Sequence, residues 1–295
     1  MIALAKNKYV IYTAIVGGYD EIMQPKVVDD RFDYILFSND IQEKQIGVWQ
    51  VRPIPYHNED NTRICRYVKT HPEELLSGYE FSVWIDSNVV ITSSKVYERA
   101  IELYNVGALI ASINHLGRDC IYDEAFEVMC HRLELEKIVV DWCHLLRREG
   151  YPKHNSLYET GVMFRIHDND QIKDFNNLWW NCIEKYSKRD QLSFNYVLWK
   201  LNLNCEYFLD KTLNTRNSTY FQLLDHVNFS KKYYALQKGQ WILKCIYKYP
   251  NKRDQMKKNY EWISAQRYPF VWLEIIGQYY RIKDFVIRNI QKRFK

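Results

Sequence analysis

Several common motifs are missing from this chain of 295 residues, and each absence argues against a class of protein. The seven cysteines are odd in number, lie far apart and form no C-x-x-C pair, which argues against a disulfide framework and a structural zinc site. No G-x-G-x-x-G fingerprint and no Gly-Lys-Ser/Thr phosphate loop occurs, so neither a Rossmann dinucleotide site nor a P-loop NTPase is expected. No Ser/His/Asp or Cys/His arrangement stands out.

Long apolar runs are missing as well. No stretch reaches the roughly eighteen apolar residues needed to cross a bilayer, and the N-terminal residues run into a strand pattern without the features of a signal peptide. Unpaired thiols fit a reducing compartment. We therefore expect a cytoplasmic protein that is either soluble or peripheral at the inner face of the membrane.

Positive charge is concentrated near the C-terminal end. Residues 231–295 contain 16 Lys and Arg against 4 Asp and Glu, whereas residues 1–230 contain 25 against 32. The acidic body and the lack of a groove-reading motif argue against nucleic acid as a partner. The basic tail instead predicts contact with an anionic surface.

Short β-branched and aromatic runs alternate with helical patterns along residues 1–230. This alternation predicts one α/β domain over that range, with a mainly parallel central sheet in a three-layer sandwich. After about residue 230 the pattern becomes basic and aromatic helix, so residues 231–295 are predicted to form a helical C-terminal extension. The predicted strands are 9–16, 34–38, 49–54, 81–86, 107–113, 161–166 and 205–208. The predicted helices are 61–70, 94–104, 120–149 with one break, 170–186 and 190–201.

The segment FSVWIDSN carries the sharpest chemical signal. A buried strand delivers Asp86 to its carboxyl end, beyond which ligands bind in such sheets, and Asn88 follows on the same side. Mg²⁺ and Mn²⁺ prefer oxygen ligands from carboxylates, phosphates and water, so the pair predicts a metal site. An aspartate that only caps the next turn would leave the same pattern. His226 is a further candidate metal ligand, although a single histidine is more often structural.

Three cations share one broad face of the helix predicted before this strand. Arg63, Arg66 and Lys69 are spaced by three residues. Arginine offers a planar fork for phosphate oxygens, and lysine offers a point charge. Together with Asp86, they are predicted to bind the diphosphate of a nucleotide-sugar donor. A solvated helix surface is the open alternative.

The loop after the first predicted strand is rich in small residues, because Tyr-Thr-Ala is followed by Gly-Gly-Tyr-Asp. Small residues and glycines let a ligand approach the backbone closely. A nucleobase and ribose are predicted to lie against Thr13 and Ala14, with Tyr19 stacking on the base.

Further polar side chains gather near predicted element ends, where a cleft would form. Glu124, Glu159 and Asp190 are candidates for a base, for a group that stabilises positive charge on the sugar, or for a partner of the acceptor hydroxyl, and Gln191 is a candidate for positioning the sugar together with Asp190. Asp190 fits the N-cap of the following helix equally well. The predicted acceptor-binding group consists of His115, Arg118, Tyr122 and Glu124.

The last segment, 271–295, interleaves large apolar side chains with six basic residues. An amphipathic basic helix of this kind can lie in a membrane interface that contains anionic lipid. A helix packed on the catalytic body, with its charges in water, fits the same pattern.

The ordered set YTAIVGGYDEI, FDYILFSND, R-x-x-R-x-x-K, FSVWIDSN, HLGRDCIYDEA, ETGVMFRIH and KRDQLSF resembles the TOD1/MUCI70 glycosyltransferase-like family over about residues 8–230. The resemblance implies a GT-A-like α/β fold, similar to family-8 glycosyltransferases with their D-x-D metal motif and later D-Q element. By this likeness Asp86 and Asn88 occupy the D-x-D positions, with asparagine removing one charge. Asp190 and Gln191 match the D-Q element near the donor sugar.

These features predict a glycosyltransferase that uses Mn²⁺ or Mg²⁺ and moves a sugar from a nucleotide-sugar donor to a hydroxyl group. The resemblance implies a glycan or lipid-linked glycan acceptor, surface polysaccharide synthesis and retention of anomeric configuration. One alternative is a non-catalytic glycan-binding or scaffold protein on a transferase-like fold, which would need neither metal nor nucleotide. A nucleotidyltransferase, which consumes NTP and releases pyrophosphate, is the second alternative.

Overall fold

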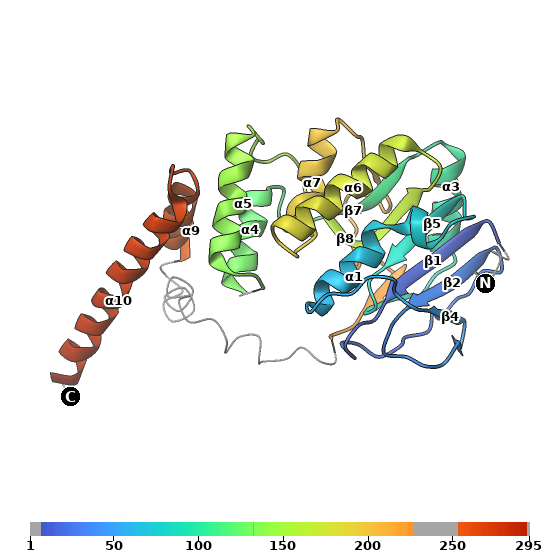
Figure 1. Cartoon of the computed structure of the whole chain (residues 1–295), viewed down its shortest axis with the longest axis horizontal. Helices are drawn as coiled ribbons and strands as arrows, with labels where there is room; N and C mark the ends of the chain where they lie inside the picture. Colours follow the sequence, from blue (N-terminus) through green and yellow to red (C-terminus); the bar gives the residue numbers. More distant parts are fainter. Residues whose placement is uncertain (1–6, 132, 227–252, 294–295) are drawn as a thin grey trace. The chain divides into compact units, whose positions relative to one another are not determined.

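The computed structural model describes residues 7–131, 133–226 and 253–293 (Figure 1). Contacts divide the chain into two units: unit 1 comprises residues 1–119 and 156–229, and unit 2 comprises residues 120–155 and 230–295. The sequence suggested one domain over residues 1–230 and an extension after it. It gave no sign that residues 120–155 group with the C-terminal helices.

A mixed eight-stranded sheet forms the centre of unit 1, in the order β3-β4-β2-β1-β5-β8-β7-β9 (Figure 1). The neighbours β4, β2, β1 and β5 are parallel, as are β7 and β9, whereas β3 and β8 are antiparallel to their neighbours. The predicted α/β class with a mainly parallel sheet is therefore confirmed. The strands are β1 Tyr9–Ala14, β2 Phe32–Phe37, β3 Gln45–Ile46, β4 Trp49–Arg52, β5 Phe81–Ile85, β7 Ile110–Asn114, β8 Tyr158–Ile166 and β9 Glu206–Tyr207. A separate antiparallel pair joins β6 Val89–Ile91 to β10 Phe221–Leu223.

Helices cover both faces of this sheet, because successive strand residues point to opposite sides. On one face, the rings of Phe32 and Tyr97 lie 5.2 Å apart and join β2 to α3. On the other, the Tyr12 hydroxyl donates to the Lys69 carbonyl and joins β1 to α1. The helices of unit 1 are α1 Asn61–Thr70, α2 Pro72–Leu75, α3 Lys95–Asn105, α6 Asp170–Lys185 and α7 Gln191–Lys200. The expected three layers are present.

The carboxyl ends of the central parallel strands meet at one edge of the sheet. Ala14 of β1 pairs with Phe37 of β2, and Ile85 of β5 pairs with Val162 near the start of the antiparallel β8. The residues that follow β5 and those that begin β8 therefore lie at the same edge. Asp86 comes directly after β5, and its backbone N–H donates to the carbonyl of Gly161 at 2.8 Å.

Unit 2 is a group of helices, namely α4 Ile121–Cys130, α5 Glu136–Arg148, α9 Arg253–Ser264 and α10 Pro269–Arg293. Buried polar contacts tie α5 to α9: the Cys143 thiol lies 2.8 Å from the Tyr260 hydroxyl, and Arg147 donates to the Ser264 hydroxyl at 2.6 Å. The predicted break in the 120–149 helix is confirmed between α4 and α5. Within the ranges that the structure describes, no helix is long and apolar enough to cross a membrane. Each cysteine in those ranges is free.

Candidate active site

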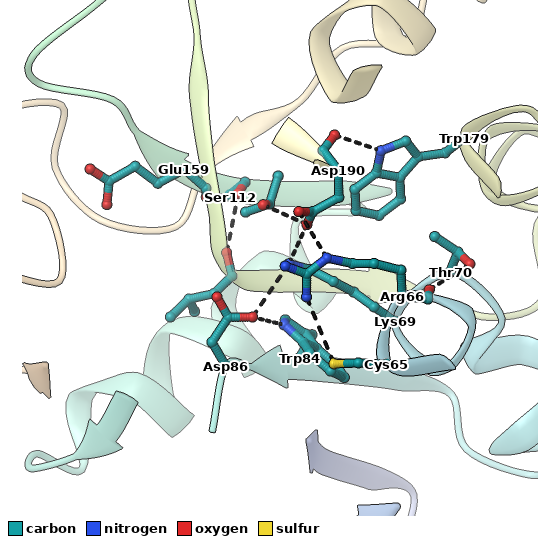
Figure 2. A network of polar contacts seen from close by, with 12 residues as sticks. Cys65, Arg66, Lys69, Thr70, Trp84, Asp86, Ser112, Glu159, Trp179 and Asp190 are labelled. Atoms are coloured by element: carbon teal, nitrogen blue, oxygen red, sulfur yellow. Dashed lines mark hydrogen bonds and ion pairs between the residues drawn. The ribbon is translucent and has the colours of Figure 1, made fainter. Parts of the chain in front are cut away.

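Asp190, just before α7, binds two cations of α1 (Figure 2). Its Oδ2 atom lies 2.6 Å from Lys69 Nζ and accepts from the Thr160 hydroxyl at 2.8 Å. Its Oδ1 atom lies 2.9 Å from Arg66 Nε, an ion pair without the alignment of a good hydrogen bond. Asp190 occupies the N-cap position of α7, as the sequence allowed, but its side chain makes no capping bond there.

Electrostatics keeps Asp190 ionised. Burial alone would raise the pKa of this carboxyl, but the positive charges of Arg66 and Lys69 outweigh burial and hold the pKa well below its usual range. Arg66 has its pKa raised by the same carboxylate, against the effect of its own burial. The charged forms are therefore mutually dependent. A carboxylate that already binds two cations and a hydroxyl is poorly suited to accept a proton or contact a sugar.

Asp86 lies on the more open side of the same cluster, with its side chain 32% exposed. Its Oδ1 atom accepts from the Trp84 indole at 2.7 Å and lies 3.4 Å from Lys69 Nζ, so Lys69 stands between the two aspartates. The Lys69 side chain is fully buried and also lies 5.3 Å from the centre of the Trp84 ring. Asp86 Oδ2 faces Gly161, where a Cβ atom would approach within 3.3 Å. Glycine at position 161 therefore leaves room beside this oxygen.

A second layer of buried groups fixes the backbone of the cluster. Arg165, fully buried in β8, donates to the Lys69 carbonyl and to the Tyr12 hydroxyl. The Trp179 indole donates to the Asp190 carbonyl at 3.0 Å. Arg165 and Trp179 are not among the predicted site residues, because an arginine in a strand and a tryptophan in a helix carry no local signal of this role.

The third cation of α1 serves another purpose. The Arg63 guanidinium donates to backbone carbonyls at the end of α6, including those of Glu184 at 3.1 Å and Tyr186 at 3.2 Å. Those carbonyls have no partner within the helix, so Arg63 satisfies and charge-complements them. The structure thus brings Arg66 and Lys69 together with Asp86, but not Arg63. The alternative of a solvated helix face does not hold either, since the Arg66 and Lys69 side chains are 14% and 0% exposed.

Two other predicted catalytic side chains form no hydrogen bond or ion pair with Arg66 or Lys69 among the described residues. Glu159 of β8 is turned away from Asp190 (Figure 2) and accepts from Arg216 at 2.9 Å and from Asn214 at 3.3 Å. Gln191 begins α7 and is half-buried.

The predicted nucleotide loop lies at the same sheet edge as Asp86. Thr13 and Ala14 end β1, and the buried Thr13 hydroxyl has no hydrogen-bond partner among the described residues. Gly17 adopts a φ of 69°, and a Cβ atom there would meet the Asn61 amide of α1 at 2.0 Å. This close approach fixes the loop against the start of α1. Tyr19 is 41% exposed, with its ring 4.7 Å from that of His226.

The three expected metal ligands make other contacts. Asn88 donates its amide to the Leu224 carbonyl at 2.9 Å, and His226 Nδ1 lies 2.9 Å from the carboxylate of Asp20. In the part of the chain that the structure describes, no three His, Cys, Asp or Glu side chains are grouped to hold a metal. The residues do fit a hard cation held by one carboxylate, Asp86, with phosphate and water completing its shell, a common mode for Mg²⁺.

The four predicted acceptor residues fall into different units. In unit 1, the ring of His115 accepts from the Arg118 backbone N–H at 2.9 Å. In unit 2, Tyr122 donates to the Tyr151 carbonyl at 2.9 Å, and Glu124 is buried in α4.

Comparison with known proteins identifies the family. The sequence profile of the TOD1/MUCI70 glycosyltransferase-like domain matches residues 1–226. The chain belongs to this family. Comparison with curated proteins gives no match. Among solved structures, the chain is similar to the apo structure of the WbbM bifunctional glycosyltransferase, with 10% identity and a TM-score of 0.37, over 68% of this chain and 38% of that one. The chain thus spans well under half of that protein.

One cavity of this TOD1/MUCI70 family member, about 400 Å³ in volume, lies away from the cluster just described. Its lining includes Phe32 at the start of β2 and Tyr79 just before β5, so it opens at the edge of the sheet opposite Asp86. Its carboxylate Asp33 accepts from Tyr79 at 2.7 Å and from Asn7 at 3.0 Å. The buried ion pairs, by contrast, lie at the carboxyl edge of the strands.

The cluster can offer a ligand one carboxylate and part of one guanidinium. Asp86 Oδ2 makes no hydrogen bond to any described residue, and no oxygen there accepts from the terminal nitrogens of Arg66. The nearest partner of Arg66 Nη1 is the Cys65 sulfur at 3.7 Å, a weak acceptor. A guanidinium whose terminal nitrogens donate to no oxygen suits a phosphate group, and the carboxylate beside it suits the counter-cation of that phosphate.

Proposed function

We propose that this member of the glycosyltransferase-like family transfers a sugar from a nucleotide-sugar donor to a hydroxyl of a glycan or lipid-linked glycan, in surface polysaccharide synthesis. The observation that carries the proposal is the arrangement of Asp86 and Arg66 over the buried Lys69–Asp190 pair. It supplies a polar site at the edge where α/β sheets bind their ligands.

Each member of the cluster has a separate part in this proposal. Arg66 donates to the diphosphate oxygens, whose negative charge grows as the bond to the sugar lengthens. Asp86 holds Mg²⁺ or Mn²⁺ that arrives with the donor, and the ion supplies further neutralisation of the leaving group. Lys69 and Asp190 are positioning residues, because both are buried and contact the donor only through Asp86 and Arg66.

The loop after β1 completes the donor site in this proposal. Thr13 and Ala14 lie where a base and ribose would approach β1, and the unpartnered Thr13 hydroxyl supports a ligand there. Retention of configuration rests on the family resemblance alone, and NMR of the freshly formed product would decide it.

Donor binding tests the proposal directly. Thermal-shift titration with UDP-, GDP- and CMP-sugars, with and without Mn²⁺, should raise the melting temperature for one donor. Arg66→Gln should weaken that donor about tenfold to hundredfold, the usual range for a charged hydrogen bond. Arg63→Gln is a matched control on the same helix, since its guanidinium binds α6 carbonyls, and donor affinity should be unchanged.

Two results would contradict the proposal. If no nucleotide sugar shifts the melting temperature, the alternative of a non-catalytic glycan-binding protein is favoured. If the chain instead consumes NTP and releases pyrophosphate, it is a nucleotidyltransferase.

Asp86→Asn should reduce turnover by a factor on the order of 10² to 10³, typical for loss of one group that stabilises transition-state charge. Full turnover in this variant would show that Asp86 is not part of the active site.

A further inference from the structure

Helix α10 presents two apolar faces, and among the described residues of unit 2 only one of these faces is packed against another helix. Leu273 and Tyr280 are buried, and the Tyr280 hydroxyl accepts from Asn259 of α9 at 3.1 Å. Figure 1 shows α10 in red as a long single helix beside α9. The second face lies roughly a third of a turn further round, at 100° per residue. We call it the outer stripe, and it consists of Trp272, Ile275, Tyr279, Ile282, Val286 and Ile290.

The outer stripe is continuous and large. Its residues follow one another at intervals of three or four, which places them on one side of the helix. Their exposed fractions run from 37% to 63%. Roughly 500 Å² of apolar surface results, whereas soluble monomers rarely expose contiguous patches above a few hundred. A patch of this size, which the described residues leave exposed, indicates a surface that binds something apolar.

Aromatic rings gather where the stripe begins. Trp262 of α9 is 46% exposed, and its ring meets that of Trp272 with centroids 5.0 Å apart. Tyr268, in the turn between the two helices, is 60% exposed. Tryptophan and tyrosine prefer the boundary between water and lipid, because each combines an apolar ring with a polar hydrogen-bonding group.

The charge of α10 favours a membrane over a second copy of the chain as the partner of the outer stripe. Helix α10 carries five basic and two acidic residues, and four of the basic ones lie in its last turns with Lys283 exposed beside the stripe. A second copy of the helix would bring a net positive charge rather than a counter-charge for these basic residues, whereas an anionic surface would attract them. We propose that the outer stripe of α10 lies in the interface of a membrane that contains anionic lipid, parallel to its plane. This proposal does not depend on the proposed transferase activity.

Vesicle flotation of the full chain tests this proposal. The protein should float with vesicles of phosphatidylcholine and phosphatidylglycerol and much less with phosphatidylcholine alone, and added salt should weaken binding. The double variant Ile275→Asp/Ile282→Asp should lower the partition coefficient at least about tenfold, because each change removes apolar area from the interface. Val106→Asp, at an equally apolar position that is 71% exposed in unit 1, is the matched control and should bind as the parent does.

A second measurement avoids any effect of the double variant on folding. Brominated anionic lipid should quench the tryptophan fluorescence of the unaltered chain, and Trp272→Phe should lose much of that quenching. Equal flotation of the parent and the double variant, or no binding to anionic vesicles, would overturn the proposal. So would a parent dimer in sedimentation that the double variant converts to monomer, since a second copy would then cover the stripe.

Discussion

Replacing Asp190 by asparagine should destabilise unit 1 strongly, because the change removes the nearest counter-charge of the buried Lys69 and of the largely buried Arg66. Lys69 Nζ and Arg66 Nε lie 2.6 and 2.9 Å from the two carboxylate oxygens. Asparagine keeps the shape of the side chain, so the change acts through charge rather than through packing. Its amide group would also place a donor beside one of the cations.

The expected loss is about 3–5 kcal/mol in the free energy of unfolding at pH 7, the usual cost of removing one partner from a buried ion pair. This is a large part of the roughly 5–15 kcal/mol that stabilises a typical domain. Urea unfolding followed by tryptophan fluorescence would measure it. Lys69→Met combined with Asp190→Asn should lose less than the sum of the two single changes, with a coupling of about 0.5–3 kcal/mol.

The dependence on pH has a definite sign. Because the pKa of Asp190 is lower in the folded than in the unfolded chain, its ionisation stabilises the fold at every pH above the unfolded value of about 3.9. That contribution is lost as pH falls below about 4 toward the folded value. The stability gap between parent and Asp190→Asn should therefore stay constant from pH 8 to 5 and narrow in acid.

The control is Asp168→Asn, whose fully exposed carboxylate lies 3.6 Å from Lys173. This variant should unfold as the parent does. If Asp190→Asn and the parent have the same urea midpoint at pH 7, or if the difference in their stability is unchanged at pH 3, the charge of Asp190 does not stabilise the fold.

Three further predictions concern the surroundings of the cluster. Arg63→Gln should lower the melting temperature, because the end of α6 loses its capping guanidinium, while donor affinity stays at the parent value. A loss of donor affinity in this variant would show that Arg63 belongs to the donor site. Gly17→Ala should cost about 1–3 kcal/mol in urea unfolding, since its φ of 69° is unfavourable for alanine and the new Cβ would strike Asn61, with Gly18→Ala as the sterically open control. His167 is buried, which lowers its pKa to about 3. The neutral ring therefore stabilises the fold fully above pH 6.5 and progressively less as pH falls toward 3. In His167→Gln the free energy of unfolding should depend less on pH between these two values.

Much of unit 1 could be predicted from local sequence. The helix 61–70 matches α1, whose N-cap Asp60 accepts from the Thr62 N–H and which ends before Pro72. The strand that delivers Asp86 is also where the sequence placed it. Periodicity and capping depend only on residues that are near in sequence, and they determine where this helix and this strand form.

The partners of the charged side chains could not be predicted in the same way. Arg63 and Arg66 share a helix face, yet one meets the end of α6 and the other meets Asp190. Spacing on a helix fixes which residues are neighbours, but the segment packed against each turn is set by tertiary structure. Asp190 was similarly ambiguous, because a residue before a helix can cap it or turn toward a distant cation.

The two-segment construction of unit 2 has a practical consequence for anyone who trims this protein. The family match ends at residue 226, and an expression clone cut there would keep α4 and α5 but discard α9. Cys143 would lose Tyr260, and the surface that buries Met256 would be uncovered. Such a fragment should aggregate, whereas a shorter clone that also replaces residues 120–155 by a brief linker should stay dispersed, because both halves of the helical unit are then gone.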